Sequence, residues 1–342
     1  MADKGLLILG IETSCDETAA SVVRDGRTVL SNVIASQVDV HKVFGGVVPE
    51  IASRHHLQLI NGVVDAALNE ASIERDEIDA IAVTKGPGLV GAILIGLATA
   101  KAMAYALGKP LVGVHHIFGH ICAALIEHPE LEPPFLALVV SGGHTSFVDV
   151  EDLSGGQGKM TVLGGTRDDA AGEAYDKVAR VLGLGYPGGP KIDAIANEGD
   201  SGKAVFKRVM LEDGSLDFSF SGLKTGVLNY INTKRQAGLP VCEADVAAGF
   251  QATVIDILAA KTKAALTKTG RRTLVLAGGV AANSALRERM RLDSEESGTK
   301  LFIPSPVYCT DNAAMIACAG YYMYTSGVTD DLSLDAYAAL PL

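Results

Sequence analysis

Hydrophobic residues along the chain form short runs separated by glycine-rich or polar turns. Residues 6–14 (LLILGIETS) are an apolar run, residues 15–18 are a polar turn, and residues 19–26 (AASVVRDG) continue as a second run to the next turn. Runs of this length, bounded by turn residues, predict the two strands of a β-hairpin. Residues 135–150 (FLALVVSGGHTSFVDV) repeat this order, with a turn of small residues between two strands.

A second pattern also occurs twice. Residues 79–84 predict a strand, a glycine loop (KGPGLVG) follows, residues 92–107 predict a helix, and PLVGVHH predicts another strand. The segment 272–305 repeats this order, with a strand at 272–277, the loop GGVAANS, a helix at 284–292 and a strand in KLFIPS. Both segments are expected to form βαβ units, in which a right-handed crossover joins parallel strands.

A hairpin followed by a βαβ unit, occurring twice, predicts an α/β protein of two related lobes with a ligand cleft between them. The proline-rich segment 128–135 marks the joint. We expect a first lobe over residues 1–131, joined near the cleft by a helix at 311–325, then a second lobe over 132–310 and a tail over 326–342.

Composition narrows the class of protein. The 342 residues are 48% hydrophobic, enough for large cores, and the net charge of −11 argues against broad non-specific nucleic-acid binding. Five scattered cysteines without a C-x-x-C motif suit a reducing cytoplasm. The N-terminus lacks the apolar core of a signal peptide. The apolar run 88–107 contains Lys101 and many small residues, which favours a buried core helix over a membrane span.

The segment HHIFGH places His116 and His120 four residues apart, so that on a helix both imidazoles share a face and can bind one metal ion. In the H-E-x-x-H motif of metallopeptidases a glutamate general base follows the first histidine, but here that residue is Ile117. The duplication places Asp311 at the matching position of the second half, as a third ligand across the cleft. Two histidines and a carboxylate suit Fe(II) or Zn(II). The competing explanations are that His120 is a core histidine and that Asp311 is only a helix N-cap.

Several loops have the composition of a nucleotide site. The turn SGGH (141–144) exposes backbone N–H groups that can hold phosphate oxygens, and AGGVAANS (277–284) leads into a helix N-terminus. In the segment 164–193, Asp168 or Asp169 is a candidate helix cap, YPGGP is expected to be a turn, and Asp176 shares a helix face with Glu173. A solvated pair of carboxylates is the competing explanation for that face. The segment FSFSGLKTG (218–226) has no role that its residues alone assign.

Taken together, these motifs resemble the TsaD family of tRNA threonylcarbamoyladenosine synthases, once classified as O-sialoglycoprotein endopeptidases. The resemblance runs from about residue 6 to about residue 325. The motifs that carry it are GIETSCDET, GGVVPEIASRHH, KGPGL, HHIFGH, VVSGGHT, DDAAGEAYDKVARVLGLGYPGGP, FSFSGLKTG, AGGVAANS and CTDNAAMIA.

The resemblance implies a duplicated, two-lobed fold of the actin-like ATPase class, related to sugar kinases and Hsp70. It implies a transferase that moves a threonylcarbamoyl group from threonylcarbamoyl-AMP to N6 of the adenosine beside the anticodon, in tRNAs that read codons beginning with A. It also implies one divalent metal, usually Fe(II) and otherwise Zn(II), and it allows ATP or ADP in the cleft, but it identifies no general base. The residues that it implies as metal ligands are His116, His120 and Asp311, and those that it implies as substrate contacts are Val139, Val140, Ser141, Gly142, Gly143, Asp176, Gly189, Asp193 and Asn283.

The implied partners are tRNA, a smaller TsaB-like paralogue bound through the first lobe, and a small TsaE-like P-loop ATPase, with no membrane. Three other functions compete with this one: a zinc peptidase, an actin-like sugar kinase or chaperone ATPase, and a non-catalytic scaffold. Ile117 argues against the first, and the three metal-ligand residues argue against the other two. A basic group near the second βαβ unit is a candidate RNA contact, with a solvated helix face as the competing explanation; its members are Arg271, Arg272, Arg287, Arg289 and Arg291.

Overall fold

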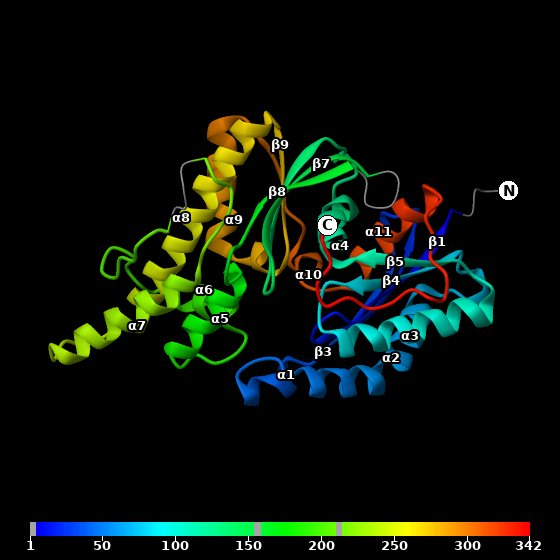
Figure 1. Ribbon diagram of the computed structural model, residues 1–342, viewed down its shortest axis with the longest axis horizontal. Coiled ribbons are helices and arrows are strands. Elements are labelled where there is room, and N and C mark those ends of the chain that lie inside the picture. The colour runs from blue at the N-terminus through cyan, green and yellow to red at the C-terminus, as the bar shows by residue number, and fades with distance from the viewer. Residues whose placement is uncertain (1–4, 154–158, 210–213) are drawn as a thin grey trace. The chain divides into compact units, whose positions relative to one another are not determined.

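The computed structural model describes residues 5–153, 159–209 and 214–342. The chain forms two compact units (Figure 1). Residues 1–4, part of the segment in which we expect no signal peptide, lie outside the described residues. Unit 1 comprises Met1–Pro134, Val150–Thr161 and Pro304–Leu342, and unit 2 comprises Phe135–Asp149 and Val162–Ile303.

Unit 1 is built on a five-stranded sheet. Its strands are β1 (Leu7–Glu12), β2 (Glu17–Arg24), β3 (Thr28–Ser36), β4 (Ala80–Gly86) and β5 (Leu111–His115), in the order β3-β2-β1-β4-β5. β1 and β3 both pair antiparallel with β2, whereas β1 pairs parallel with β4, and β4 with β5. The expected hairpin and first βαβ unit are therefore confirmed, and β3 extends the hairpin by one strand.

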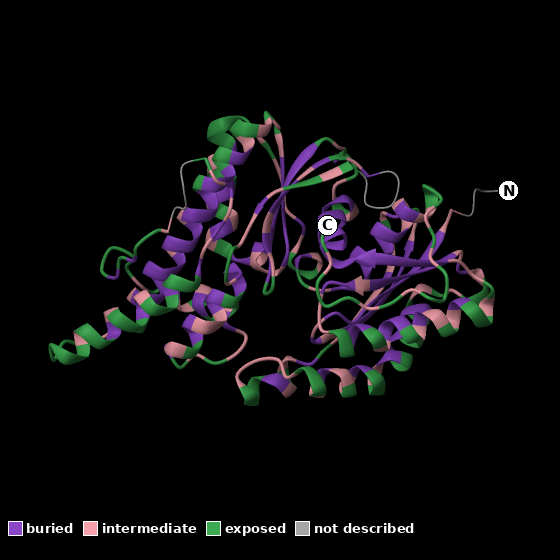
Figure 2. Ribbon diagram, in the orientation of Figure 1, coloured by how far each residue is buried: buried purple, intermediate pink, exposed green. Residues whose placement is uncertain are grey.

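Helices cover both faces of this sheet. They are α1 (Val38–His41), η1 (Lys42–Phe44), α2 (Pro49–Ala71), η2 (Arg75–Glu77), α3 (Val90–Leu107), α4 (His116–Glu127), α10 (Pro306–Cys309) and α11 (Ala313–Thr325). Leu7, Leu9 and Ile11 of β1 share a hydrophobic core with α2 and α3. The alternate positions of β1 face α11, because successive side chains of a strand point to opposite faces. Burial on both faces explains why β1 is apolar almost throughout (Figure 2).

Gly10 sets the distance between β1 and α11. A Cβ atom at this position would stand 2.3 Å from the carbonyl oxygen of Ala313, far inside van der Waals contact. Only glycine lets the backbone of α11 approach the strand so closely. This contact fixes the start of α11, two residues after Asp311.

The second sheet has the same plan. Its strands are β6 (Phe135–Val140), β7 (Thr145–Asp152), β8 (Lys159–Gly165), β9 (Thr273–Ala277) and β10 (Lys300–Phe302), in the order β10-β9-β6-β7-β8. β9 pairs parallel with β6 and with β10. In both sheets the third, second, first, fourth and fifth strands lie side by side in that order, which confirms the duplication. The helices of unit 2 are α5 (Ala171–Val181), α6 (Gly188–Ala196), α7 (Ser221–Gln236), α8 (Glu243–Thr269), η3 (Gly279–Ala282) and α9 (Ser284–Ser297).

Two local expectations in unit 2 are wrong. Gly188 and Gly189 do not form a free turn but open α6, since the preceding Pro187 has an extended backbone that suits a helix entry. Asp168 does not cap α5, whose N-cap is Ala170. Its carboxylate instead accepts hydrogen bonds from the backbone N–H groups of Phe220 and Ser221, at 2.8 and 3.3 Å, and so caps α7 from a distant part of the chain.

The C-terminal residues belong to unit 1 and run along β5 rather than forming a separate tail. Asp330 donates its N–H to the carbonyl of Leu111 in β5 at 2.8 Å, and Tyr337 donates to that of Lys85, at the end of the neighbouring β4, at 2.8 Å. The unit boundaries at Pro134 and Ile303 also differ from the expected 131 and 310, because α11 packs on the first sheet and α10 packs on α4.

Among the described residues, α3 is the one helix long and apolar enough to cross a membrane by length and composition. Its residues Leu97, Ala100 and Ala104 are buried in the core shared with β1 and α2. This placement agrees with the expected core helix.

Candidate functional site

The two histidines of the H-x-x-x-H pair stand on the first turns of α4. His115 ends β5, as expected, and caps the helix, because its Nδ1 accepts the N–H of Ile117 at 3.2 Å while its Nε2 donates to the carbonyl of Leu340 at 3.0 Å. Burial lowers the pKa of His115 to about 4, so that the ring is neutral. With both nitrogens engaged, His115 is unavailable as a ligand. His116 and His120 follow on one face of the helix.

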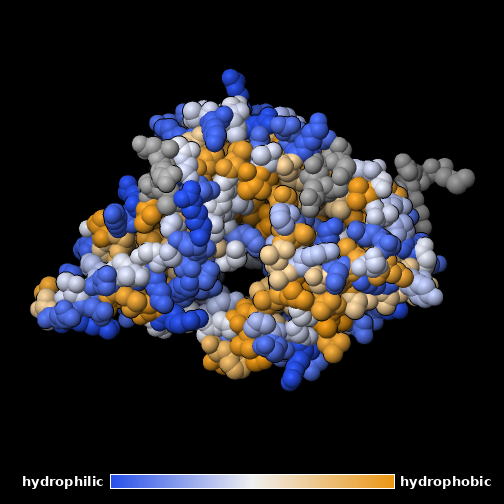
Figure 3. Space-filling view, in the orientation of Figure 1, coloured by the Kyte–Doolittle hydropathy of each residue, from blue (hydrophilic) through white to orange (hydrophobic). Residues whose placement is uncertain are grey.

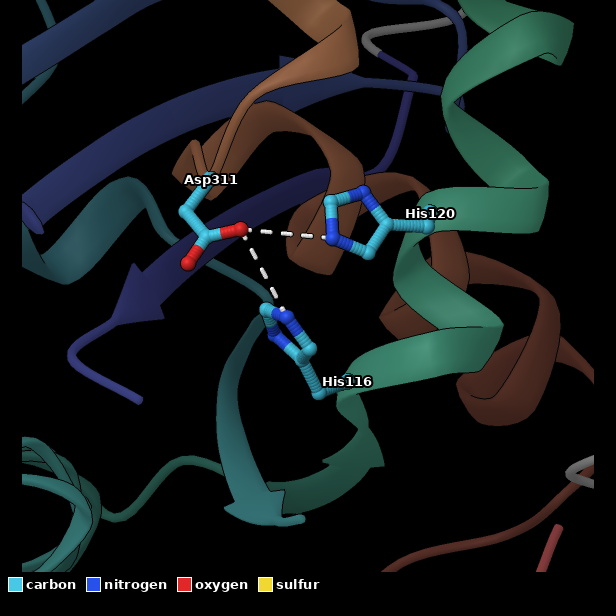
Figure 4. Close-up of side chains that lie close together, drawn as sticks. All are labelled: His116, His120 and Asp311. Carbon is cyan, nitrogen blue, oxygen red and sulfur yellow. Dashed lines mark ion pairs between the residues drawn. The ribbon is translucent and has the colours of Figure 1, made fainter. Parts of the chain in front are cut away.

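Asp311 lies beside both histidines (Figure 4). Its Oδ1 is 3.5 Å from His116 Nε2 and 3.2 Å from His120 Nε2, and the potential ligand atoms of the three residues all lie within 4.8 Å of one another. All three residues belong to unit 1. The sequence-based expectation that Asp311 reaches the histidines from the second lobe is therefore corrected, because α10 and α11 return to the first sheet after β10.

The competing explanation for Asp311 fails. The N-cap of α11 is Asn312, whose side-chain oxygen accepts the N–H of Met315 at 3.0 Å. The amide of the same fully buried Asn312 donates to the carbonyl of Thr310 at 2.8 Å. Asn312 thus holds the loop, and the carboxylate of Asp311 is directed at the histidines.

A buried carboxylate stands behind His116. Glu12, fully buried at the end of β1, has its Oε2 2.9 Å from His116 Nδ1 and also accepts the hydroxyl of Thr84 at 2.7 Å. Burial alone would lower the pKa of His116, but the carboxylates of Glu12 and Asp311 outweigh it and raise the pKa to about 9. A histidine held through Nδ1 by a carboxylate presents its Nε2 outward, which is the usual support for a metal-binding imidazole.

His120 supplies the observation that tests the site for a metal. Its ring is fully buried, and neither ring nitrogen makes a well-aligned hydrogen bond. Burial lowers the pKa of His120 and favours the neutral ring, which is the form that binds metals. His120 Nε2 lies 3.2 Å from Asp311 Oδ1 in a poorly aligned contact, and a metal ion bound by both residues would satisfy this buried nitrogen. Two imidazoles and one carboxylate fit Fe(II) or Zn(II) with positions left for substrate.

The residues expected to contact a nucleotide lie in unit 2. The turn after β6 is closed by the N–H of Ser141, which donates to the carbonyl of His144 at 2.7 Å. A Cβ atom on Gly172 would stand 2.7 Å from the carbonyl oxygen of Ser141, so this glycine lets the start of α5 meet the turn. Gly142 and Gly143, like Gly189 on α6, have open space where a side chain would stand. Val139 and Val140 are fully buried in β6, so a ligand can meet only their main chain.

The polar members of this set are held in place by hydrogen bonds. Asp176 on α5 accepts the N–H of Gly188 at 2.7 Å, which joins α5 to α6. Asn283 is the N-cap of α9, and Asp193 on α6 accepts the N–H and the hydroxyl of Ser284 at 2.9 and 3.0 Å. Glu173, the other carboxylate on that helix face, is exposed and forms an ion pair with Lys177.

The arginine group near the second βαβ unit is largely paired with acids. Arg271 bonds Asp149 through two nitrogens, at 2.6 and 3.1 Å. Arg289 lies 2.8 Å from Asp256, and Arg291 lies between Glu288 and Glu295 on the same helix. These ion pairs favour the explanation that the arginines belong to a solvated surface. They do not form the row of unpaired cations that an RNA contact would use.

Sequence reasoning missed two buried residues, Glu12 and Gln251. Glu12 lies in GIETSCDET, where a glutamate that ends a buried strand was the available signal. Gln251, in the middle of α8, bonds both Asp193 and Asn283. A single glutamine in a long helix carries no such signal.

Comparison with known proteins shows which family this chain resembles in sequence. The sequence model of the TsaD family, described as tRNA N6-adenosine threonylcarbamoyltransferase, matches residues 28–318. A protein of that name from Moorella thermoacetica is 56% identical over 335 residues, which cover 98% of this chain and 97% of the relative. One from Clostridium perfringens is 54% identical over 336 residues, covering 98% of each chain.

Solved structures of other proteins share the fold at low identity. HypF from T. kodakarensis aligns with a TM-score of 0.62 at 16% identity, over 96% of this chain and 49% of HypF. The activator of 2-hydroxyisocaproyl-CoA dehydratase from Clostridium difficile aligns with a TM-score of 0.53 at 12% identity, over 95% and 99% of the two chains. Such likeness shows a shared fold, here the duplicated α/β fold described above. The chain belongs to the TsaD family of tRNA N6-adenosine threonylcarbamoyltransferases.

Proposed function

We propose that this protein transfers a threonylcarbamoyl group from threonylcarbamoyl-AMP to N6 of the adenosine beside the anticodon, in tRNAs that read codons beginning with A. The observation that carries the proposal is the 56% identity to a tRNA N6-adenosine threonylcarbamoyltransferase over 97% of that relative. The reaction forms a bond between N6 and the carbamoyl carbon and breaks the bond from that carbon to the AMP oxygen. AMP leaves with the bonding electron pair, and N6 loses a proton.

His116, His120 and Asp311 would hold one divalent metal, Fe(II) in the first instance and Zn(II) as the alternative. Support comes from the two buried imidazoles, the adjacent carboxylate and the poorly aligned contact between His120 Nε2 and Asp311. When bound, the metal supplies Lewis-acid chemistry toward the carbonyl or the threonine carboxylate of the substrate. Glu12 would orient His116 through Nδ1.

The residues of unit 2 would bind the adenylate. The N–H groups of the turn Ser141–Gly143 are suited to phosphate oxygens, and the open space at Gly142 and Gly143 permits close approach. Asp176, Asp193 and Asn283 offer polar groups to the nucleoside, and Gly189 leaves room for it. Since AMP is a good leaving group, holding the reactants in place would supply much of the rate enhancement. The same residues would admit ATP or ADP.

The proposed partners are tRNA, a TsaB-like paralogue on unit 1 and a small TsaE-like ATPase, all in the cytoplasm. Apolar side chains gather at the surface over α1 and its neighbours (Figure 3). Val43, Phe44 and Leu57 are 74%, 56% and 64% exposed there, an unusual degree of exposure for large apolar side chains. Such a group is suited to burial against another protein.

Two of the three rival functions, the peptidase and the sugar kinase, gain no support from the geometry. Ile117 is buried, and Glu12, the carboxylate that contacts His116, bonds the Nδ1 side of the ring rather than the Nε2 side where a peptidase water would be activated. A sugar kinase has no use for the His-His-Asp group.

Reconstitution tests the proposal. Unmodified tRNA, labelled threonine, bicarbonate and ATP are incubated with this protein, a threonylcarbamoyl-AMP synthase and the two partners, and in parallel with preformed threonylcarbamoyl-AMP. We expect label in tRNA that comigrates with threonylcarbamoyladenosine after nuclease digestion. Absence of label with preformed donor under complete conditions contradicts the proposal.

A further inference from the structure

A line of hydrogen bonds, buried at its α9 end and part-buried at its α6 end, crosses unit 2 from α9 to α6. The N–H of Leu286 donates to Asn283 Oδ1 at 2.8 Å, Asn283 Nδ2 donates to Gln251 Oε1 at 2.8 Å, and Gln251 Nε2 donates to Asp193 Oδ1 at 3.1 Å. Gln251 is 4% exposed and Asn283 is 8% exposed. The central residue of this line is therefore Gln251, in the middle of α8.

The direction of every bond in the line is determined from its end at Leu286. The backbone N–H of Leu286 can only donate, so the amide of Asn283 must turn its oxygen to that N–H and its nitrogen to Gln251. Because the oxygen of the Gln251 amide accepts from Asn283, its nitrogen is the atom turned to Asp193. Position 251 thus requires an acceptor toward Asn283 and a donor toward Asp193. Only the amide of glutamine meets both requirements at this length.

Gln251 also contacts the element that carries Asp176. The hydroxyl of Tyr175, on α5, lies 3.5 Å from Gln251 Oε1, and the ring of Tyr175 is almost fully buried. One side chain on α8 therefore touches residues from α5, α6 and the N-cap of α9. These are the three elements that carry Asp176, Asp193 and Asn283.

The hydrogen bonds on Asp193 leave it able to bind a ligand. Its Oδ1 accepts from Gln251 and from the hydroxyl of Ser284, and its Oδ2 accepts the N–H of Ser284. A carboxylate offers about four acceptor positions, so one remains on Oδ2. The side chain is half-buried and thus open to solvent on one side. Rotation of this carboxylate would move the remaining position, and Gln251 together with Ser284 prevents that rotation.

We propose that Gln251 is a positioning residue of the nucleotide site: it fixes the orientation of Asp193 and Asn283 without touching the nucleotide. This inference rests on the proposed function, which assigns Asp193 and Asn283 to the nucleotide site. Gln251 therefore sets the affinity for the AMP portion of the donor and leaves the metal centre in unit 1 unchanged.

The test measures AMP binding by titration calorimetry on the full-length protein. The variants are Gln251→Glu, which places a second carboxylate against Asp193, and Gln251→Met, which keeps the length and removes both hydrogen-bonding groups. We expect AMP affinity to fall by at least about tenfold in Gln251→Met, which leaves the buried amide of Asn283 without its acceptor, and further in Gln251→Glu, which sets two carboxylates against each other. Thr262→Val is the matched control, because Thr262 is buried on the same helix and bonds only the carbonyl of Leu258. It should bind AMP as the unaltered protein does.

A double-mutant cycle separates positioning from a general loss of structure. If Gln251 acts through Asp193, Gln251→Met should have little further effect on AMP affinity in an Asp193→Ala background. Equal effects in both backgrounds would overturn the proposal, as would wild-type affinity in folded Gln251→Met. If the unaltered protein itself fails to bind AMP, the assignment of the nucleotide site is refuted instead. Metal content and melting temperature, measured on every variant, show whether unit 1 and the fold are intact.

Discussion

The two units share one strand plan but place their polar groups in different ways. In unit 1 the candidate chemistry comes from side chains that are almost wholly buried, namely Glu12, His116 and His120. In unit 2 it comes from glycine backbone with open space around it and from half-exposed acids that a buried network holds. Burial lowers the pKa of His120 and favours its neutral, metal-binding form, whereas Glu12 holds the ring of His116 through Nδ1. Open backbone suits a large ligand that must enter and leave. The difference predicts that changes in one unit alter metal binding and that changes in the other alter nucleotide binding.

The largest effect is expected for His120→Ala. Removing one of three ligands should reduce the metal content of the purified protein to background and reduce transfer by more than about 100-fold, beyond the loss typical of an outer-shell partner. Metal analysis and the tRNA assay measure these changes. His128→Ala, at the far end of α4, is the control and should keep both. Full transfer by a metal-depleted His120→Ala protein would contradict the metal centre.

Glu12→Gln should weaken metal binding by about 10- to 100-fold, because the neutral amide supports the imidazole of His116 less well than the carboxylate does. Competition with a chelator measures this affinity. AMP affinity should stay unchanged, since Glu12 lies in unit 1. Glu130→Gln serves as control, since Glu130 is exposed. Equal loss of AMP and metal affinity in Glu12→Gln would contradict the prediction that unit 1 binds the metal and unit 2 binds the nucleotide.

Gly172→Ala tests the converse case: a change in unit 2 that should alter nucleotide binding and leave metal binding unchanged. The added methyl group would stand 2.7 Å from the carbonyl oxygen of Ser141, so the turn Ser141–Gly143 must shift. We expect weaker AMP binding, a loss of about 1–3 kcal/mol in the free energy of unfolding, and unchanged metal content. Calorimetry, denaturant titration and metal analysis measure these three quantities. Gly226→Ala on α7 is the control, because its nearest neighbour would be 3.8 Å away. Unaltered AMP affinity in Gly172→Ala would show that this turn does not bind the nucleotide.

The smallest effect concerns the cap of α7 by Asp168. Burial would raise the pKa of this carboxyl, but hydrogen bonds from Ser219, Phe220 and Ser221 outweigh it and lower the pKa below its ordinary 3.8. A lowered folded-state pKa means that the stabilisation is present above the ordinary value and is lost as pH falls through the folded value. Asp168→Ala should therefore cost about 1 kcal/mol near pH 7. The cost should shrink below pH 4. Urea unfolding of both proteins across this range measures the difference; a constant difference would contradict the assignment.

Much of the architecture was predictable because its signals are local. Apolar runs between glycine turns predicted β1, β2, β4 and β5, and their repetition predicted the second sheet. The four-residue spacing of His116 and His120 predicted two imidazoles on one helix face. Three expectations failed because contacts with distant residues outweigh local signals. Gly188 opens a helix instead of a turn, and Asp168 caps a helix that begins 53 residues later instead of the adjacent one. The C-terminal residues, expected to be a tail, pair with β5.

The sequence alone determined the repeated fold and the kinds of residue at each candidate site, because periodicity and turn chemistry act between near neighbours. Only the tertiary structure decided which residues meet. It brought Asp311 to the histidines within unit 1, placed Glu12 against a ring 104 residues later, and set Gln251 between Asp193 and Asn283. These contacts depend on how helices pack on sheets, through close approaches such as that at Gly10. Such packing is a property of the folded chain as a whole, and no short segment of the sequence records it.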